Sequence, residues 1–262
     1  MQSEVLSHGV LELDTLPFEL AALASAQRYQ SWVFETIQPF LGKRILEIGA
    51  GIGNMSAWLP VQERLILTET DPELHKILLK SVEAVKTVDP RISVQKFDVL
   101  TDSIEPFVAE NLDTVVSFNV LEHIDDDEKA FQLLCQILKQ SRTTGSRRLI
   151  TFVPAHNWAY GSLDKTFGHH RRYSSSRIRE LSRKLAPEAK LTLGHFNTVG
   201  LLGWLVNGRL LRKQTLGLGT VKVFEALCPM LRPIDSVLHG VLRLPIGQSL
   251  YAVWEWDPKV SS

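Results

Sequence analysis

The stretch from Arg44 to Ser56, RILEIGAGIGNMS, places an apolar run directly before a loop with glycine at alternate positions. The pattern predicts a strand, a tight turn and the start of a helix. Gly49, Gly51 and Gly53 carry no Cβ, so the backbone can bend sharply there and a ligand can approach it closely. The helix that we expect next would add unpaired N–H groups at its first turn. The stretch therefore predicts a ligand-binding loop.

The identity of the ligand depends on the spacing of these glycines. The dinucleotide fingerprint has its third glycine three positions after the second, where this chain has Asn54. The carboxylate of Glu47 would repel a pyrophosphate but suits a ligand that carries an ammonium and a sulfonium. The order Glu47, Gly49, Gly51, Gly53 resembles the first motif of class I S-adenosylmethionine-dependent methyltransferases. This resemblance implies S-adenosyl-L-methionine as the cofactor, and a glycine-rich turn without a ligand is the alternative.

Apolar runs that alternate with helical patterns predict an α/β fold. The run from Val115 to Val120 is almost wholly apolar, which is typical of a strand buried on both faces of a parallel sheet. The resemblance implies a Rossmann-like methyltransferase fold, with a mostly parallel seven-stranded sheet, helices on both faces and an antiparallel last strand. We predict the strands at the start of 44–56 and in 65–69, 92–99, 115–120, 147–155, 190–198 and 248–256.

Polar residues stand at the ends of three of these strands, where open α/β sheets bind ligands. Glu69 ends the second strand, and an acid at this position can accept hydrogen bonds from both ribose hydroxyls of a nucleoside. The resemblance implies that Asp98 accepts a hydrogen bond from the adenine amino group and that the N–H of Val99 meets a ring nitrogen. Asn119 ends the fourth strand at the same edge. We therefore predict that these four residues contact the cofactor.

The stretch NVLEHIDDD follows the fourth strand and closely resembles the fourth motif of small-molecule methyltransferases of this class. His123 lies in this stretch, at the edge of the sheet where ligands bind. It is a candidate catalytic residue, and the alternative is a histidine beside the core that its neighbours hold. The sequence leaves both interpretations open.

The segment after Pro154, AHNWAYGSLDKTFGHHRRYSSS, has no clear periodicity, and loops of this length in compact domains are usually functional. It resembles a branch of bacterial methyltransferases in which Pro-Ala is followed by an aspartate and by Gly-His-x-Arg-Arg-Tyr. Histidine suits proton removal near neutral pH, and arginine suits recognition of planar anions. We predict His169 as a general base, with acceptor contacts at Tyr160, Asp164, Arg171, Arg172 and Tyr173. In the alternative, His169 and Arg172 only tie the loop to Asp164.

Residues 199–247 form an insertion between the last two predicted strands. The insertion is rich in leucine and carries several arginines and lysines, and none of its apolar runs reaches the ~18 residues of a membrane span. We predict helices that cover the acceptor. An interfacial role, with an apolar face in a bilayer and arginines at the head groups, is the alternative.

Composition limits the other partners. Lys+Arg and Asp+Glu are balanced at 29 each, so no overall field attracts nucleic acid. Cys135 and Cys228 lack a metal-like spacing, and we predict no metal site. The first residues lack a basic region followed by an apolar core, which favours a cytoplasmic protein. Nothing in the sequence indicates an oligomeric state.

We predict a single methyltransferase domain over residues 1–262. Residues 1–43 form a helical cover, in which Tyr29 either contacts the cofactor or only packs; residues 44–155 form the cofactor half and 156–262 the acceptor half. The predicted reaction is methyl transfer to a small-molecule, glycan or lipid-linked acceptor, as an O-methylation. The rivals are an NAD-dependent reductase, a non-catalytic S-adenosylmethionine-binding protein and an aminopropyl transferase of the same fold.

Overall fold

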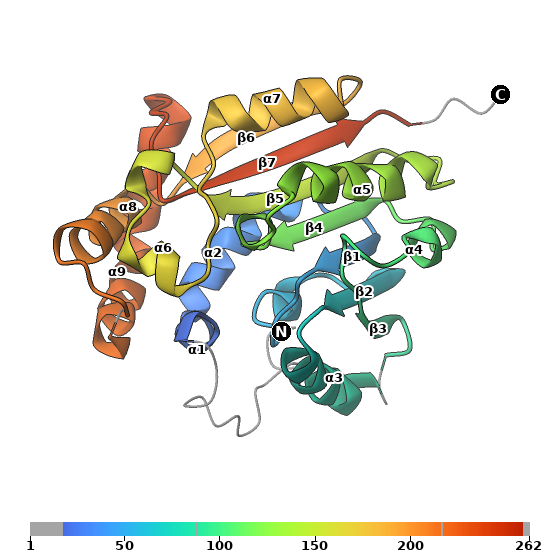
Figure 1. Cartoon of the computed structure of the whole chain (residues 1–262), viewed down its shortest axis with the longest axis horizontal. Coiled ribbons are helices and arrows are strands. Elements are labelled where there is room, and N and C mark those ends of the chain that lie inside the picture. The colour runs from blue at the N-terminus through green and yellow to red at the C-terminus, as the bar shows by residue number, and fades with distance from the viewer. Residues whose placement is uncertain (1–17, 87–88, 216, 259–262) are drawn as a thin grey trace.

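The computed structural model describes residues 18–86, 89–215 and 217–258, and its seven-stranded sheet carries helices on both faces (Figure 1). The order of the strands is β3-β2-β1-β4-β5-β7-β6. Neighbours from β3 to β5 are parallel, whereas β7 is antiparallel to both β5 and β6. The strands are β1 (Arg44–Ile48), β2 (Arg64–Glu69), β3 (Ile92–Lys96), β4 (Thr114–Phe118), β5 (Arg147–Pro154), β6 (Lys190–Phe196) and β7 (Ser249–Trp256). The predicted fold class is confirmed.

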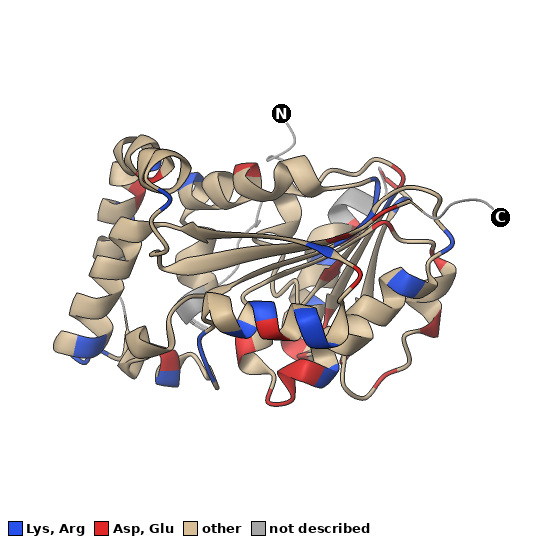
Figure 2. Cartoon of the chain, turned by 90° about the horizontal axis from the view of Figure 1, so that it is seen from above, with Lys and Arg blue, Asp and Glu red and all other residues tan. Residues whose placement is uncertain are grey.

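Alternate residues of the central strands enter two different cores. Leu46 and Ile48 of β1 belong to the core under α5 (Asp127–Gln140) and α7 (Ser175–Leu185). Ile45 belongs to the core under α2 (Gln27–Ile37) and α3 (Pro72–Lys86). Figure 2 shows the sheet between these layers of helices. Burial on both faces explains why the strand sequences are continuous apolar runs rather than alternating ones.

The glycine loop after β1 has the backbone conformation that its sequence requires. Gly49, Gly51 and Gly53 have φ angles of 66°, 59° and 92°, a region that side-chain-bearing residues rarely adopt. A Cβ on Gly49 would lie only 2.7 Å from Cγ2 of Val120. The helix that we expected to start here is replaced by a three-residue 3₁₀ turn, Ser56–Trp58. The loop itself, and not a helix N-terminus, therefore faces the ligand edge of the sheet.

The described part of the predicted helical cover contains two helices, α1 and α2. Helix α1 (Phe18–Ala24) ends before Ser25, and α2 begins after Ala26, whose N–H is bonded to Leu23 O. A 3₁₀ turn at Gln38–Phe40 then leads to β1. The break lets α1 turn toward the glycine loop, where Leu20 O accepts a hydrogen bond from the Asn54 side chain.

The insertion stands at one end of the molecule (Figure 1). It forms α8 (Thr198–Trp204), a π-helical segment Leu205–Leu210, α9 (Leu218–Ser236) and a second π-helical segment Val237–Val241. Trp204 and Cys228 are buried, so the insertion completes the core as well as covering the sheet. Short helices α4 (Glu105–Ala109) and α6 (Ser162–Thr166) complete the fold. Among the described residues, no helix combines the length and apolar character needed to cross a membrane.

Candidate active site

A cavity of about 1190 Å³ lies at the carboxyl edge of the parallel strands. Its lining begins at the glycine loop, continues along the ends of β2 to β4 and the loop after β5, and ends at α8 and α9. Pockets for single small ligands usually measure about 300 to 1,000 Å³. The cavity therefore has room for a nucleoside cofactor and for a second ligand beside it.

One end of the cavity gathers nearly all the predicted cofactor residues. The residues that line it are Tyr29, Glu47, Gly49, Gly51, Glu69, Asp98, Val99 and Asn119. Gly53 is not among the residues that line the cavity, and its contact with the cofactor stays a prediction. Its N–H donates to Ala50 O at 2.9 Å, so Gly53 closes the turn that presents the two earlier glycines.

Glu69 ties the end of β2 to the glycine loop. Its side chain is only 6% exposed, and Oε2 accepts a hydrogen bond from the Gly51 N–H at 2.7 Å. Oε1 accepts from the N–H groups of Thr70 and Asp71 at 2.8 and 2.9 Å. Glu69 therefore shapes the glycine loop in addition to facing the cavity.

Glu47 is a buried carboxyl group at the start of the same loop. Ser56 Oγ donates a hydrogen bond to its Oε2 at 2.5 Å. Burial raises the pKa of Glu47 to about 7, an effect that the Ser56 hydrogen bond partly opposes. The group therefore changes charge near neutral pH, and a cation that binds beside it favours the ionised form.

Asn119 turns the chain from β4 into the cavity edge. Its φ of 52° lies in the left-handed region, which asparagine tolerates better than most residues. The N–H of Asn119 donates to Phe152 O at 2.7 Å and holds the turn against β5. The turn leads directly into the 3₁₀ segment Leu121–His123.

The predicted loop residues Asp164, His169 and Arg172 form one buried network. Asp164 Oδ1 lies 2.9 Å from His169 Nδ1 and 2.7 Å from Arg172 Nε. Burial alone would raise the pKa of Asp164, but the hydrogen bond from His169 and the charge of Arg172 hold it below its ordinary value. Since a carboxylate only accepts hydrogen bonds, we assign the proton to Nδ1 of His169 and the lone pair to Nε2. His169 and Arg172 line the cavity.

Tyr173 and Asp164 are corrected as acceptor contacts, because both are completely buried and neither lines the cavity. The Tyr173 hydroxyl, which has one proton to donate, lies 2.9 Å from Asp127 Oδ2 and 3.1 Å from Leu121 O. Tyr173 therefore packs the loop onto α5. Asp164 orients His169 and Arg172 from the side away from the cavity.

Tyr160 and Arg171 make hydrogen bonds within the protein, and their predicted acceptor contacts stay predictions. The Tyr160 hydroxyl donates to His169 O at 2.8 Å. The Arg171 guanidinium donates to the carbonyl oxygens of Ile124 and Asp125. Neither side chain lines the cavity, so both order the loop. The alternative for His169 and Arg172, that they only tie the loop to Asp164, stays open, because both contact Asp164 and both line the cavity.

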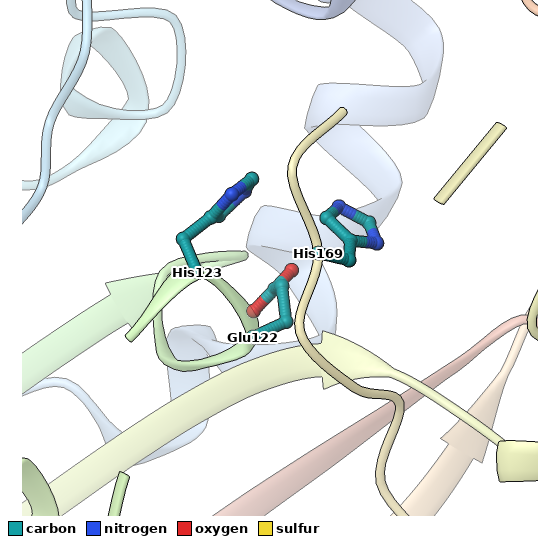
Figure 3. A group of neighbouring side chains, drawn as sticks. All are labelled: Glu122, His123 and His169. Carbon is teal, nitrogen blue, oxygen red and sulfur yellow. The ribbon is translucent and has the colours of Figure 1, made fainter. Parts of the chain in front are cut away.

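His123 lines the cavity, and its two interpretations, as a catalytic residue or as a histidine held by its neighbours, stay predictions. Its side chain is exposed, and its ring centroid lies 4.8 Å from that of His169 in an edge-to-face arrangement. Figure 3 shows the two rings turned toward each other with Glu122 between them. Glu122 is completely buried. Glu122 was not among the predicted site residues, although its position next to His123 in the LEH turn is a usable signal.

The outer part of the cavity is apolar and comes from the insertion. The sequence predicted only that this segment covers the acceptor. The residues of this segment that line the cavity include Leu202, Trp204, Val206, Val223, Phe224, Leu227 and Leu231. The leucine-rich composition of residues 199–247 was the available signal, but helical periodicity does not tell which face meets the cavity.

Comparisons with known proteins identify the family of the chain. A family model described as a methyltransferase domain matches residues 24–185. The human mitochondrial ubiquinone biosynthesis O-methyltransferase is 32% identical over 105 residues, which are 39% of this chain. The chain spans only 27% of that protein's length.

Solved structures establish the fold. A geranyl diphosphate methyltransferase in complex with S-adenosylmethionine has a TM-score of 0.57 at 13% identity, with 98% of this chain and 94% of that chain covered. Phosphoethanolamine N-methyltransferase 2 of Haemonchus contortus, also in complex with the cofactor, has a TM-score of 0.56 at 16% identity, with 96% and 61% covered. The chain therefore belongs to the methyltransferase domain family and is an S-adenosyl-L-methionine-dependent methyltransferase.

Proposed function

We propose that the enzyme O-methylates a hydroxyl group on a small molecule with an extended apolar part, which enters from a lipid surface. The observation that carries the proposal is a single cavity that runs from the glycine loop past His169 to exposed aliphatic residues of the insertion. The name of the human relative, an O-methyltransferase, supports oxygen as the acceptor atom.

The chemistry requires positioning and the removal of one proton. Methyl transfer is an in-line displacement at the sulfonium carbon, whose leaving group is already activated. A hydroxyl acceptor must also lose its proton, and a histidine held by a carboxylate is suited to take it. We assign this role to Nε2 of His169, with Asp164 holding the Nδ1–H at 2.9 Å. Arg172, which lies 4.5 Å from the Trp204 ring centroid, supports the wall beside it.

The mouth of the cavity supports an apolar acceptor. Leu202, Val206, Val223 and Leu227 line the cavity and are also exposed on the surface. Apart from Trp158, all exposed large hydrophobic residues in the described part of the chain lie between 202 and 246. Exposed apolar residues concentrated in one segment are what a membrane or partner contact would use.

Basic residues accompany this apolar surface, which we call the insertion surface. Arg209, Arg212, Lys222 and Arg243 are exposed on the same segments as the aliphatic residues. An apolar face with arginines and lysines beside it is suited to the boundary between anionic head groups and acyl chains. We therefore commit to an anionic bilayer as the surface from which the acceptor enters.

Vesicle binding tests this part of the proposal. The double substitution Leu210→Asp and Val241→Asp changes two side chains that are 76% and 73% exposed, so the fold should tolerate it. Burying one such side chain contributes about 1.5 to 3 kcal/mol, so we expect at least a tenfold loss of binding to phosphatidylglycerol-containing vesicles. Flotation measures the bound fraction. Trp158→Asp, outside the insertion surface, is the matched control; equal losses in both variants would contradict membrane docking.

A pH profile tests the role of Glu47 at the cofactor. Because burial raises the pKa of Glu47 to about 7, its carboxyl is mostly neutral below that pH and ionised above it. The cationic cofactor prefers the ionised form, so its affinity should rise about tenfold from about pH 6 to about pH 8. Calorimetry at each pH measures the rise, and Glu47→Gln should remove this component while retaining any titration of the ligand itself. A profile with the same slope in both proteins would contradict the assignment.

The acceptor is tested directly by product analysis. The enzyme is incubated with methyl-labelled cofactor and separate lipid and water-soluble fractions of a cell extract. We expect label in the lipid fraction, in a methyl ether that mass spectrometry identifies. Label confined to water-soluble products, or attached to nitrogen or carbon, would overturn the proposed acceptor class while leaving the methyltransferase activity in place.

A further inference from the structure

Three potential metal ligands converge at the inner wall of the cavity. Glu122, His123 and His169 each offer one ligand atom, and these three atoms lie within 4.8 Å of one another. Two of the residues are adjacent in the turn after β4, and the third comes from the loop after β5 (Figure 3). Nitrogen and oxygen ligands of a tetrahedral zinc ion lie roughly 3.3 to 3.5 Å apart, given bonds of about 2.1 Å. Small side-chain movements would therefore bring the three atoms onto one cation.

The partners of His169 resemble those of a metal-ligating histidine. A histidine that binds a metal usually donates its other ring N–H to a carboxylate or carbonyl, which fixes the ring orientation. Asp164 accepts from Nδ1 of His169 at 2.9 Å and is itself held by Arg172 at 2.7 Å. Nε2 is then the ring nitrogen on the side of the ring away from Asp164, as a ligand would require. This arrangement is independent of the distances within the cluster.

The ligand set selects the class of cation. Two imidazole nitrogens with one carboxylate suit zinc and iron(II), and this set leaves coordination positions open for a substrate. Mg²⁺ and Ca²⁺ prefer oxygen ligands throughout. The exposed side of the cluster faces the cavity, because His123 and His169 both line it. An open coordination position would therefore face the acceptor.

We infer that Glu122, His123 and His169 bind a divalent transition-metal cation of the zinc class, which contacts the acceptor hydroxyl. Sequence spacing predicted no metal, since the third ligand is 46 positions after His123. The catalytic part of the inference rests on the proposed O-methylation and changes how His169 acts, because a cation would occupy Nε2. The hydroxyl binds the cation and releases its proton to solvent. Its oxygen then forms a bond to the methyl carbon as the carbon–sulfur bond breaks, which yields the methyl ether and S-adenosylhomocysteine.

Metal binding is measured without cofactor or acceptor, on protein first treated with a chelator. Calorimetric titration with Zn²⁺ should show one site per chain, with little binding of Mg²⁺. His123→Ala should weaken Zn²⁺ binding by at least the ~10- to 100-fold that loss of an outer partner typically causes. Since His123 is exposed, this variant should fold. His170→Ala removes another cavity-lining histidine, whose side chain is 47% exposed, and should leave the affinity within about twofold.

Two further measurements make the inference decisive. Glu122→Gln keeps the size of the buried side chain, and its Zn²⁺ affinity should fall while its melting temperature confirms folding. If the protein shows no saturable Zn²⁺ binding, or if the His123 and His170 variants bind Zn²⁺ with equal affinity, the proposed metal site is wrong. Turnover that survives complete metal removal would overturn its catalytic part. One bound Zn²⁺ without methyl transfer to any hydroxyl would contradict the proposed function instead.

Discussion

Replacing Gly51 with valine is expected to abolish S-adenosyl-L-methionine binding. Gly51 has a φ of 59°, where a β-branched residue is a genuine outlier, and it lines the cofactor end of the cavity. A Cβ there would lie 3.2 Å from the Leu20 side chain, and the two methyl groups would extend further. We expect calorimetry to show at least a 100-fold loss of affinity, because steric block removes the ligand's contact with the loop.

The control for this prediction is Gly145→Val. A Cβ on Gly145 would meet nothing within 4 Å, so the same change in side chain is made away from the cavity. Thermal unfolding distinguishes loss of binding from loss of folding, because the left-handed conformation costs roughly 1 to 2 kcal/mol for a residue with a side chain. A folded Gly51→Val protein that binds the cofactor with unchanged affinity would place the cofactor elsewhere.

Glu69→Gln provides a smaller change at the same end of the cavity. The amide keeps the shape of the side chain but loses the charge and one accepting oxygen. Glu69 accepts from the N–H groups of Gly51, Thr70 and Asp71, and we propose that it also receives the ribose hydroxyls. The loss of a charge-assisted hydrogen bond should weaken cofactor binding by about 1 to 3 kcal/mol, measured by calorimetry. An unchanged affinity would leave Glu69 as a structural residue only.

Substituting His169 with alanine is expected to reduce turnover by ~10² to 10⁴, with cofactor affinity unchanged. This range is the usual contribution of acid–base catalysis, and the variant also loses a ligand if a cation is bound. His169 is not among the predicted cofactor residues, so the contacts of those residues should be preserved. Single-turnover kinetics with a hydroxyl acceptor measures the chemical step, and calorimetry measures the cofactor.

His170→Ala is the matched control, because this neighbouring histidine lines the same cavity without joining the Asp164 network. Its turnover should remain within about threefold of the wild type. Equal losses in the two variants, or a loss below about fivefold for His169→Ala, would exclude His169 from the activation of the acceptor. His123 would then be the next candidate in the cavity.

Local sequence determined the sheet and the cofactor end of the site. Largely apolar runs such as 115–120 are typical of strands with both faces covered. Carboxyl ends of parallel strands share one edge, so acids and amides at those ends had to meet beside the glycine loop. Eight of the nine predicted cofactor residues accordingly line one cavity, and Gly53 is the exception. These residues could be grouped from the sequence because the order of the strands fixes which strand ends are neighbours.

The loop from 155 to 173 could not be assigned in the same way. Histidine, arginine, tyrosine and aspartate suit both ligand binding and internal hydrogen bonding, and sequence does not show which partner each side chain finds. In the structure, the Tyr173 hydroxyl is hydrogen-bonded to Asp127 and the Arg171 guanidinium to a backbone carbonyl. His169 and Arg172, in contrast, line the cavity. The burial of each side chain thus distinguishes ligand binding from internal hydrogen bonding, which the residue types alone do not distinguish.

The sequence by itself indicated an α/β fold, because its apolar runs alternate with helical patterns, and its resemblance to class I methyltransferases indicated the cofactor and the seven-stranded sheet. Only the tertiary structure brought His169 to Glu122 and His123, and only it turned the exposed aliphatic face of the insertion toward the cavity mouth. The physical reason is that both arrangements join segments far apart in the chain. Their proximity depends on how loops and helices pack, which no local pattern encodes.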